Sequence, residues 1–209
     1  MRLYCQRRGY AMIITFDGKR ENVIERITRE LASPVVKGTL KDAPHDFPDD
    51  VSLVITNYVH GPSPTAPLLA ESRNFLQRIH RCRDQPRYIP LILIAPYETD
   101  AQFRARSTQH LEEATQLTSP DLVIVERNYG GTDIRFHILP PVRRLLDEPQ
   151  FYRNNPRIVT PVGVLASNPS GGEIIMNCMK LLPVAEYFGD KSRYGRVLSP
   201  LPRYLSALR

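Results

Sequence analysis

The chain has no tryptophan, only three cysteines and no long apolar run among its 209 residues. Cys5, Cys82 and Cys178 lie far apart, whereas disulfide frameworks and zinc sites need paired or closely spaced cysteines. A membrane-spanning helix needs about 18 or more consecutive apolar residues, and the sequence contains no such run. The basic residues 1–10 are not followed by the apolar core of a secretion signal. We therefore expect a cytoplasmic protein with reduced thiols, no metal and no membrane span.

Nucleotide-binding loops are also missing from the sequence. It contains neither the G-x-x-x-x-G-K-[ST] pattern of a phosphate-binding loop nor G-x-G-x-x-G after a strand. One glycine-rich stretch, NPSGGE at residues 168–173, precedes an apolar run and is typical of a helix start with Ser170 as its cap. Such a helix start can also bind an anion, but the pattern is short and common. We therefore predict no cofactor.

Positive charge is concentrated near the end of the chain. Residues 1–150 contain 20 basic and 19 acidic side chains, whereas residues 151–209 contain 8 and 3. A basic segment can bind nucleic acid, acidic proteins or anionic lipid. A solvated surface with a few extra arginines explains the same excess and is the more common case, so the charge alone identifies no partner.

Apolar runs alternate with amphipathic stretches through most of the chain. Strands rich in β-branched residues are expected at residues 11–16, 34–40, 51–58, 90–97 and 120–129. Helices with one apolar stripe are expected at residues 17–33, 66–83 and 100–118, and residues 132–149 are expected to form a last helix or a broken pair of helices. This order predicts an α/β domain over residues 10–149, with a five-stranded doubly wound parallel sheet and helices on both faces.

One connection is unusual for this architecture. Residues 41–50 join the second and third expected strands, and a parallel crossover usually needs about a dozen residues or more. The crossover helix is therefore missing or reduced to a turn, or the two strands pair antiparallel instead.

The element order and several local strings resemble the receiver domain of two-component response regulators. SLVITNYVHGPS (52–63) is similar to the family's third strand, D-L-I-[IL]-[ST]-D-x-x-[ML]-P, and PLILIAPYETD (90–100) is similar to its fourth. DLVIVERNY (121–129) corresponds to the fifth strand, and ITFDGKRENVIERITREL (14–31) to the first strand and helix. The resemblance covers residues 11–148 and implies a flavodoxin-like receiver fold.

The residues that carry receiver chemistry are altered in this sequence. The resemblance places Asn57 where the family has its phosphate-accepting aspartate, and an amide cannot form the acyl phosphate that a carboxylate forms. Asp17 is the one carboxylate left of the family's acidic pair. Ala95 stands at the switch hydroxyl, and Glu126 stands at the conserved lysine. These four residues predict a degenerate, phosphorylation-incompetent pseudo-receiver pocket; an unrelated flavodoxin-like domain is the alternative.

Ligands of open parallel sheets bind beyond the carboxyl ends of the strands. Side chains expected near that edge, besides the degenerate pocket, are Tyr58, His60, Tyr97, Glu98 and Arg127. Asp17, His60 and Glu98 could serve an enzyme acting on a nucleotide or another phosphorylated small molecule. A capping role for Asp17 and a solvated loop position for His60 are the simpler explanations.

Residues 150–209 form a basic, proline-rich extension with two apolar runs, 158–166 and 174–188. So much apolar surface argues against disorder, yet the segment is small for an independent core. We expect it to pack on the α/β domain or on a partner. Its last stretch mixes arginine with tyrosine, a combination that suits protein interfaces and also stacks on nucleic-acid bases. These residues are Arg193, Tyr194, Arg196, Arg203 and Tyr204.

The function that fits best is that of a non-catalytic regulatory or adaptor protein in signal transduction. The receiver-like domain would bind a protein partner or a second copy of the chain. The resemblance implies pairing through the fourth helix, fifth strand and fifth helix, which correspond to residues 100–148. The alternatives are a small enzyme on a flavodoxin-like scaffold, and nucleic-acid binding through the tail.

Overall fold

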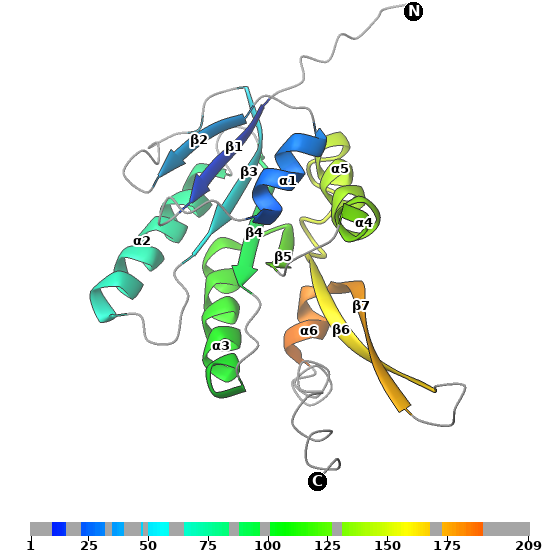
Figure 1. The fold of residues 1–209 in the computed structure, drawn as a ribbon. Helices are drawn as coiled ribbons and strands as arrows, with labels where there is room; N and C mark the ends of the chain where they lie inside the picture. Colours follow the sequence, from blue (N-terminus) through cyan, green and yellow to red (C-terminus); the bar gives the residue numbers. More distant parts are fainter. Residues whose placement is uncertain are drawn as a thin grey trace, which may run out of the picture.

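A computed structural model describes residues 10–15, 22–31, 35–39, 47, 50–58, 65–83, 88–96, 101–126, 131–167 and 173–189. These residues form an α/β fold around one seven-stranded sheet with the order β2-β1-β3-β4-β5-β6-β7 (Figure 1). The strands are β1 Tyr10–Thr15, β2 Val35–Thr39, β3 Val51–Asn57, β4 Leu91–Pro96, β5 Leu122–Glu126, β6 Arg157–Ser167 and β7 Glu173–Pro183.

The first six strands run parallel, and β7 pairs antiparallel with β6. The α/β class with a mostly parallel sheet is confirmed, but the prediction of five strands was wrong. β6 adds a sixth parallel strand beside β5, and β7 folds back on β6 as a hairpin. The first five strands keep the order 2-1-3-4-5, which is the flavodoxin-like arrangement.

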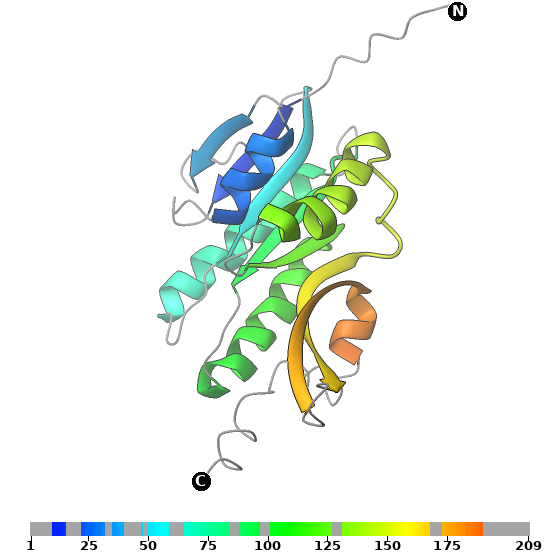
Figure 2. The ribbon, with the colours of Figure 1, turned by 45° about the vertical axis from the view of Figure 1, so that its right-hand side comes forward.

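Helices cover both faces of the sheet (Figures 1 and 2). They are α1 Asn22–Leu31, α2 Ala66–Arg83, α3 Ala101–Thr118, α4 Gly131–Asp133, the π-helical turn η2 Ile134–Ile138, α5 Leu139–Asp147 and α6 Val184–Gly189. One apolar cluster joins α1, η2 and α5 to the sheet, and the other joins α2, α3 and α6 to its opposite face. The result is a three-layer fold.

The central strands are buried because nearly all their residues are apolar. On β4, Ile92 and Ile94 belong to the cluster on the α1 face, whereas Leu91, Leu93 and Ala95 belong to the cluster on the α2 face. Each strand therefore contributes to both cores, as side chains alternate across a sheet. Burying one such aliphatic side chain stabilises the fold by about 1.5–3 kcal/mol.

The short connection after β2 does not change the strand direction. β2 and β3 both pair parallel with β1, on its two sides, so the alternative of antiparallel pairing between them was wrong. Most of residues 41–50 lies outside the described residues. Phe47 is described, and it packs half-buried against the apolar cluster on the α2 face.

The helix expected over residues 132–149 contains two prolines and is not uniform. Pro140 and Pro141 lie at the start of α5, directly after the π-helical turn η2. A proline ring clashes with the carbonyl four residues earlier, which here belongs to Phe136 or His137. The wider π-helical turn removes that clash while the chain stays helical.

Two strands of the extension join the sheet. Leu122, Val123 and Ile124 of β5 pair with the start of β6, and Ile158 and Val159 enter the two cores. The helix start predicted at NPSGGE was wrong, because the chain from Glu173 is strand β7, paired with β6 over its whole length. An apolar run without clear periodicity fits a buried helix or a strand, and the neighbouring β6 decided the outcome.

Candidate functional site

The carboxyl ends of β3, β4 and β5 bring three of the predicted pocket positions to one edge of the sheet. Asn57 ends β3 and pairs with Ile94 of β4, while Ala95 pairs with β5 one position further along. Glu126 ends β5, opposite Pro96. Residues far apart in the sequence therefore end three adjacent strands, at the end of the sheet where parallel α/β folds bind ligands, although Asn57 lies on the α1 face and Ala95 on the α2 face.

Asn57 is the central residue of this edge, on a strand flanked by β1 and β4. Its exposed fraction is only 1%, and strand alternation places it on the α1 face together with Ile55. The Thr56 hydroxyl donates a hydrogen bond to the Asn57 carbonyl oxygen over 3.3 Å. An ionised carboxylate is costly at such a buried position unless it is paired, whereas a neutral amide needs only hydrogen bonds.

Ala95 and Tyr58 both belong to the apolar core on the α2 face. Ala95 is fully buried and brings no hydroxyl group, and Tyr58 is 4% exposed in the same cluster. The Tyr58 ring thus contributes to packing beneath this edge of the sheet.

The remaining predicted site residues are not placed. Glu126 is described only through its backbone pairing. The others lie outside the described residues: Asp17, His60, Tyr97, Glu98, Arg127, Arg193, Tyr194, Arg196, Arg203 and Tyr204. Among the described residues, no group of three or more histidine, cysteine or acidic side chains is arranged to hold a metal ion.

A second polar cluster, not anticipated from the sequence, lies at the opposite edge of the sheet. Arg83 ends α2 and Asp121 directly precedes β5, and their side chains are almost completely buried. The Arg83 guanidinium donates to Asp121 Oδ2 over 2.5 Å and to the Tyr88 hydroxyl over 2.9 Å. The Tyr88 hydroxyl in turn donates to Asp121 Oδ1.

The same arginine also binds main-chain carbonyls at the end of α3 and just before β4. Its Nε donates to Ile89 over 3.0 Å, and one terminal nitrogen donates to Thr118 and Ser119 over 2.7 and 2.8 Å. The backbone N–H of Leu91 donates to Asp121 Oδ2 over 2.8 Å. This cluster therefore ties the end of α2, the start of β4 and the end of α3 to β5.

Burial is the main influence on the acid of this cluster. It raises the pKa of Asp121, while Arg83, Tyr88 and the Leu91 N–H act in the opposite direction. Burial also raises the pKa of the Tyr88 phenol, so this group stays protonated and can donate. All five N–H donors of Arg83 bind oxygen atoms of the protein. The cluster is therefore structural, and Arg83 has no N–H group left to bind a ligand.

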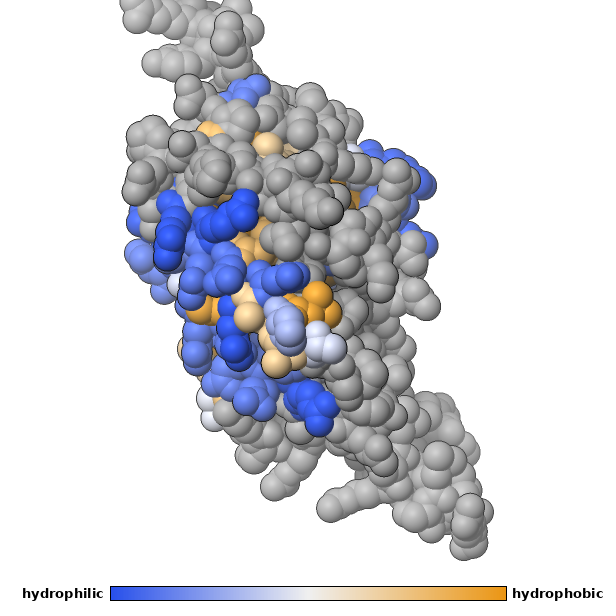
Figure 3. All heavy atoms as spheres, turned by 90° about the vertical axis from the view of Figure 1, so that its left-hand side faces the viewer, coloured by the Kyte–Doolittle hydropathy of each residue, from blue (hydrophilic) through white to orange (hydrophobic). Residues whose placement is uncertain are grey.

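A third group of charges lies on the outer surface of α2 and α3. Arg73 of α2 forms an exposed ion pair with Glu113 of α3. His110 lies beside them, and its Nδ1 is buried without a hydrogen-bond partner among the described residues. Partial burial lowers the pKa of His110; Glu113 opposes this effect, and Arg106 and Arg73 add to it. In Figure 3, the coloured part of the side with α2 is mostly hydrophilic, with small apolar areas between the polar side chains.

No family model matches the chain, and no curated protein matches it. None of the described helices is long and apolar enough to cross a lipid bilayer.

Proposed function

We propose that this chain is a pseudo-receiver: a non-catalytic regulatory protein that binds other proteins and does not accept a phosphoryl group. The observation that carries the proposal is the position of Asn57. It ends the third strand of a sheet whose first five strands have the order 2-1-3-4-5, with buried Ala95 on the neighbouring strand. The receiver-like strings of the sequence favour the same assignment.

The chemistry of these two side chains supports a loss of phosphoryl transfer. An amide is a poor nucleophile. Residue 57 therefore cannot attack a phosphodonor and form the acyl phosphate that a carboxylate forms. A methyl group at Ala95 cannot donate a hydrogen bond to a phosphoryl oxygen. We therefore propose that the domain has the scaffold of a receiver domain but lacks the reactive groups at positions 57 and 95.

The usual receiver pairing surface would have to differ in this protein. The interaction face expected over residues 100–148 needs a free outer edge of β5. In this protein β6 pairs with that edge. We therefore propose that partners bind elsewhere, at surfaces that β6, β7 and α6 add to the domain.

A thermal-shift panel with nucleotides and sugar phosphates, each with and without Mg²⁺, tests this proposal against an enzyme on the same scaffold. A ligand at about 100 times its dissociation constant stabilises a protein by about 2.7 kcal/mol, which is readily measured. The proposal predicts unchanged melting temperatures throughout the panel. A Mg²⁺-dependent increase with one phosphorylated compound would overturn it in favour of the enzyme.

A further inference from the structure

The segment from β6 to α6 is bonded more extensively within itself than to the rest of the sheet. β6 pairs with β7 through 11 residue pairs, but with β5 through three. The N–H of Val184, the first residue of α6, donates to the carbonyl of Pro156 over 2.9 Å, directly before β6. The two strands and α6 are therefore one connected unit, which we call the hairpin unit (residues 157–189).

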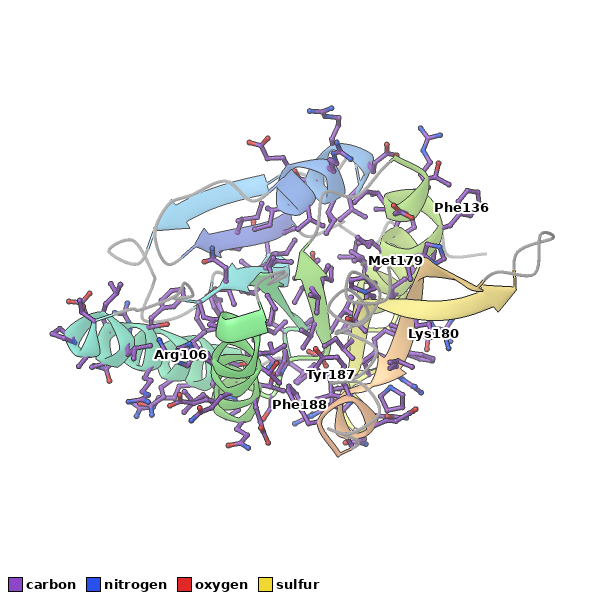
Figure 4. The ribbon with its side chains drawn as sticks, turned by 60° about the horizontal axis from the view of Figure 1, so that its bottom comes forward. Arg106, Phe136, Met179, Lys180, Tyr187 and Phe188 are labelled. Atoms are coloured by element: carbon purple, nitrogen blue, oxygen red, sulfur yellow. The ribbon has the colours of Figure 1, made fainter. Side chains whose placement is uncertain are left out.

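Apolar contacts hold the hairpin unit on both faces of the sheet. Ile158 lies in the cluster on the α2 face, and Val159 lies in the cluster on the α1 face. Tyr187 of α6 is buried in the cluster on the α2 face, and Phe188 packs against the same cluster (Figure 4). Apolar burial is not directional, so these contacts alone do not determine the course of the turn that leads into β6.

Directional contacts hold that turn at the edge of the sheet where the parallel strands begin. The turn spans residues 148–156, between α5 and β6. The guanidinium of Arg153 lies over the ring of Tyr88, 4.4 Å from the ring centroid. Directly after the turn, the N–H of Arg157 donates to the carbonyl of Asp121 over 3.0 Å. Both contacts reach the buried polar cluster at this edge of the sheet.

Tyr88 is itself held by that cluster. Its hydroxyl donates to the Asp121 carboxylate and accepts from Arg83 over 2.9 Å. The Arg83 guanidinium also lies 5.3 Å from the centroid of the Tyr88 ring. Buried groups therefore fix the ring, whereas Arg153 is exposed and approaches it from the turn. A cation over a tyrosine ring is attracted by the electrons of its face, so the fixed ring gives the turn a defined position.

We propose that Arg153 and Tyr88 form a latch. Their contact holds the turn at residues 148–156, and loss of the contact favours a local opening in which the hairpin unit leaves the sheet as one body. In this opening the three residue pairs to β5 break, whereas the 11 pairs between β6 and β7 stay intact. Connected segments of a native protein open together in this way, at a free energy below that of global unfolding.

Hydrogen exchange of the full chain, followed by mass spectrometry, tests the latch. Arg153→Gln removes the cation and should speed amide exchange in residues 157–189 by about two- to five-fold, the factor that corresponds to an exposed cation–π contact. Exchange in β1, β3 and β4 should keep the wild-type rate. Arg153→Lys keeps a cation and should exchange more slowly than Arg153→Gln. Arg143→Gln, at an exposed arginine of α5, is the control and should leave all rates unchanged.

A double-mutant cycle tests whether Tyr88 is the group that Arg153 binds. Tyr88→Leu removes the ring, so adding Arg153→Gln to it should cause no further increase of exchange in the hairpin unit. Tyr88→Phe keeps the ring and removes only the hydroxyl. In that background Arg153→Gln should still have its full effect, even though the buried cluster has lost a hydrogen bond.

Equal exchange rates in Arg153→Gln and the wild type, or an increase spread evenly over all strands, would overturn the latch. A full effect of Arg153→Gln in the Tyr88→Leu background would overturn it as well. These measurements use no ligand and no partner, so they are independent of the proposed function, which the ligand panel tests separately.

Discussion

At the scale of single residues, Arg83 is the centre of a buried hydrogen-bond network in the described part of the chain. Its guanidinium binds one carboxylate, one phenol and three main-chain carbonyls, and both it and Asp121 are removed from water. Pairing two charges in the interior contributes little net stability, because desolvation offsets their attraction. Removing one partner is costly, because the other charge stays buried without compensation.

We predict that Asp121→Asn lowers the free energy of unfolding by about 3–5 kcal/mol, since it leaves the Arg83 charge buried and unpaired. Urea unfolding followed by circular dichroism measures the loss. Glu148→Gln, which breaks the exposed pair with Arg144, is the control and should cost less than about 1 kcal/mol. Equal losses for the two substitutions would show that the buried cluster has no special role.

His110 provides a pH-dependent contribution to stability. Burial holds its pKa below the ordinary value of 6.5, so the unfolded chain binds the proton more readily than the folded one. Stability should therefore fall as the pH decreases from above 6.5 toward the lowered pKa of the folded protein. We predict a flatter dependence of the unfolding free energy on pH for His110→Asn. His137→Asn, at an exposed histidine, is the matched control, and an identical flattening there would refute the assignment.

At the scale of helices and strands, the end of α3 combines favourable contacts with backbone strain. Ser119 follows α3 with φ of 45°, a left-handed conformation that suits glycine better than residues with a Cβ atom. Its N–H donates to Thr115 over 2.9 Å, and its carbonyl accepts from Arg83. The backbone is therefore held in this conformation by groups on both sides.

We predict that Ser119→Gly raises the free energy of unfolding by about 0.5 kcal/mol, because relief of strain exceeds the entropy that glycine adds to the unfolded chain. Ser119→Val should lower it by about 1 kcal/mol, because a β-branched side chain fits the left-handed region poorly. Chemical unfolding of the three proteins measures both changes. A valine variant as stable as the glycine variant would contradict the claim that the backbone of Ser119 is strained.

The elements with clear periodicity were predictable from the sequence. The helices expected at residues 66–83 and 100–118 correspond to α2 Ala66–Arg83 and α3 Ala101–Thr118, because apolar stripes of helical spacing mark them. The strand at residues 173–183 was not predictable in this way. Its apolar run has no helical or strand period, and only the pairing with β6 determines its structure.

The candidate site was predictable only where the sheet order fixes it. Asn57 and Ala95 were expected at the carboxyl ends of neighbouring strands, and the sheet places them there. The cluster of Arg83, Tyr88 and Asp121 was missed, because Arg83 and Asp121 are 38 positions apart and no local spacing signals their contact. Such contacts depend on how helix ends and strand starts meet in the folded chain.

At the scale of the whole molecule, a flavodoxin-like order of five strands is extended by the hairpin of β6 and β7 and by α6. The extension makes β5 an internal strand and places β7 last in the strand order of the described sheet. In Figure 1 the hairpin projects away from the helical layers, on the side of the sheet toward which the parallel strands point. Under the proposed function, the domain would recognise its partners through the surfaces that these added elements provide.

The most direct test of this account is phosphoryl transfer. The full chain is incubated with acetyl phosphate and Mg²⁺, and its intact mass is measured by mass spectrometry, with a phosphorylatable receiver domain as the positive control. The account predicts an unchanged mass for this chain under conditions that modify the control fully. An added phosphoryl group on Asp17 or on any other side chain would contradict it.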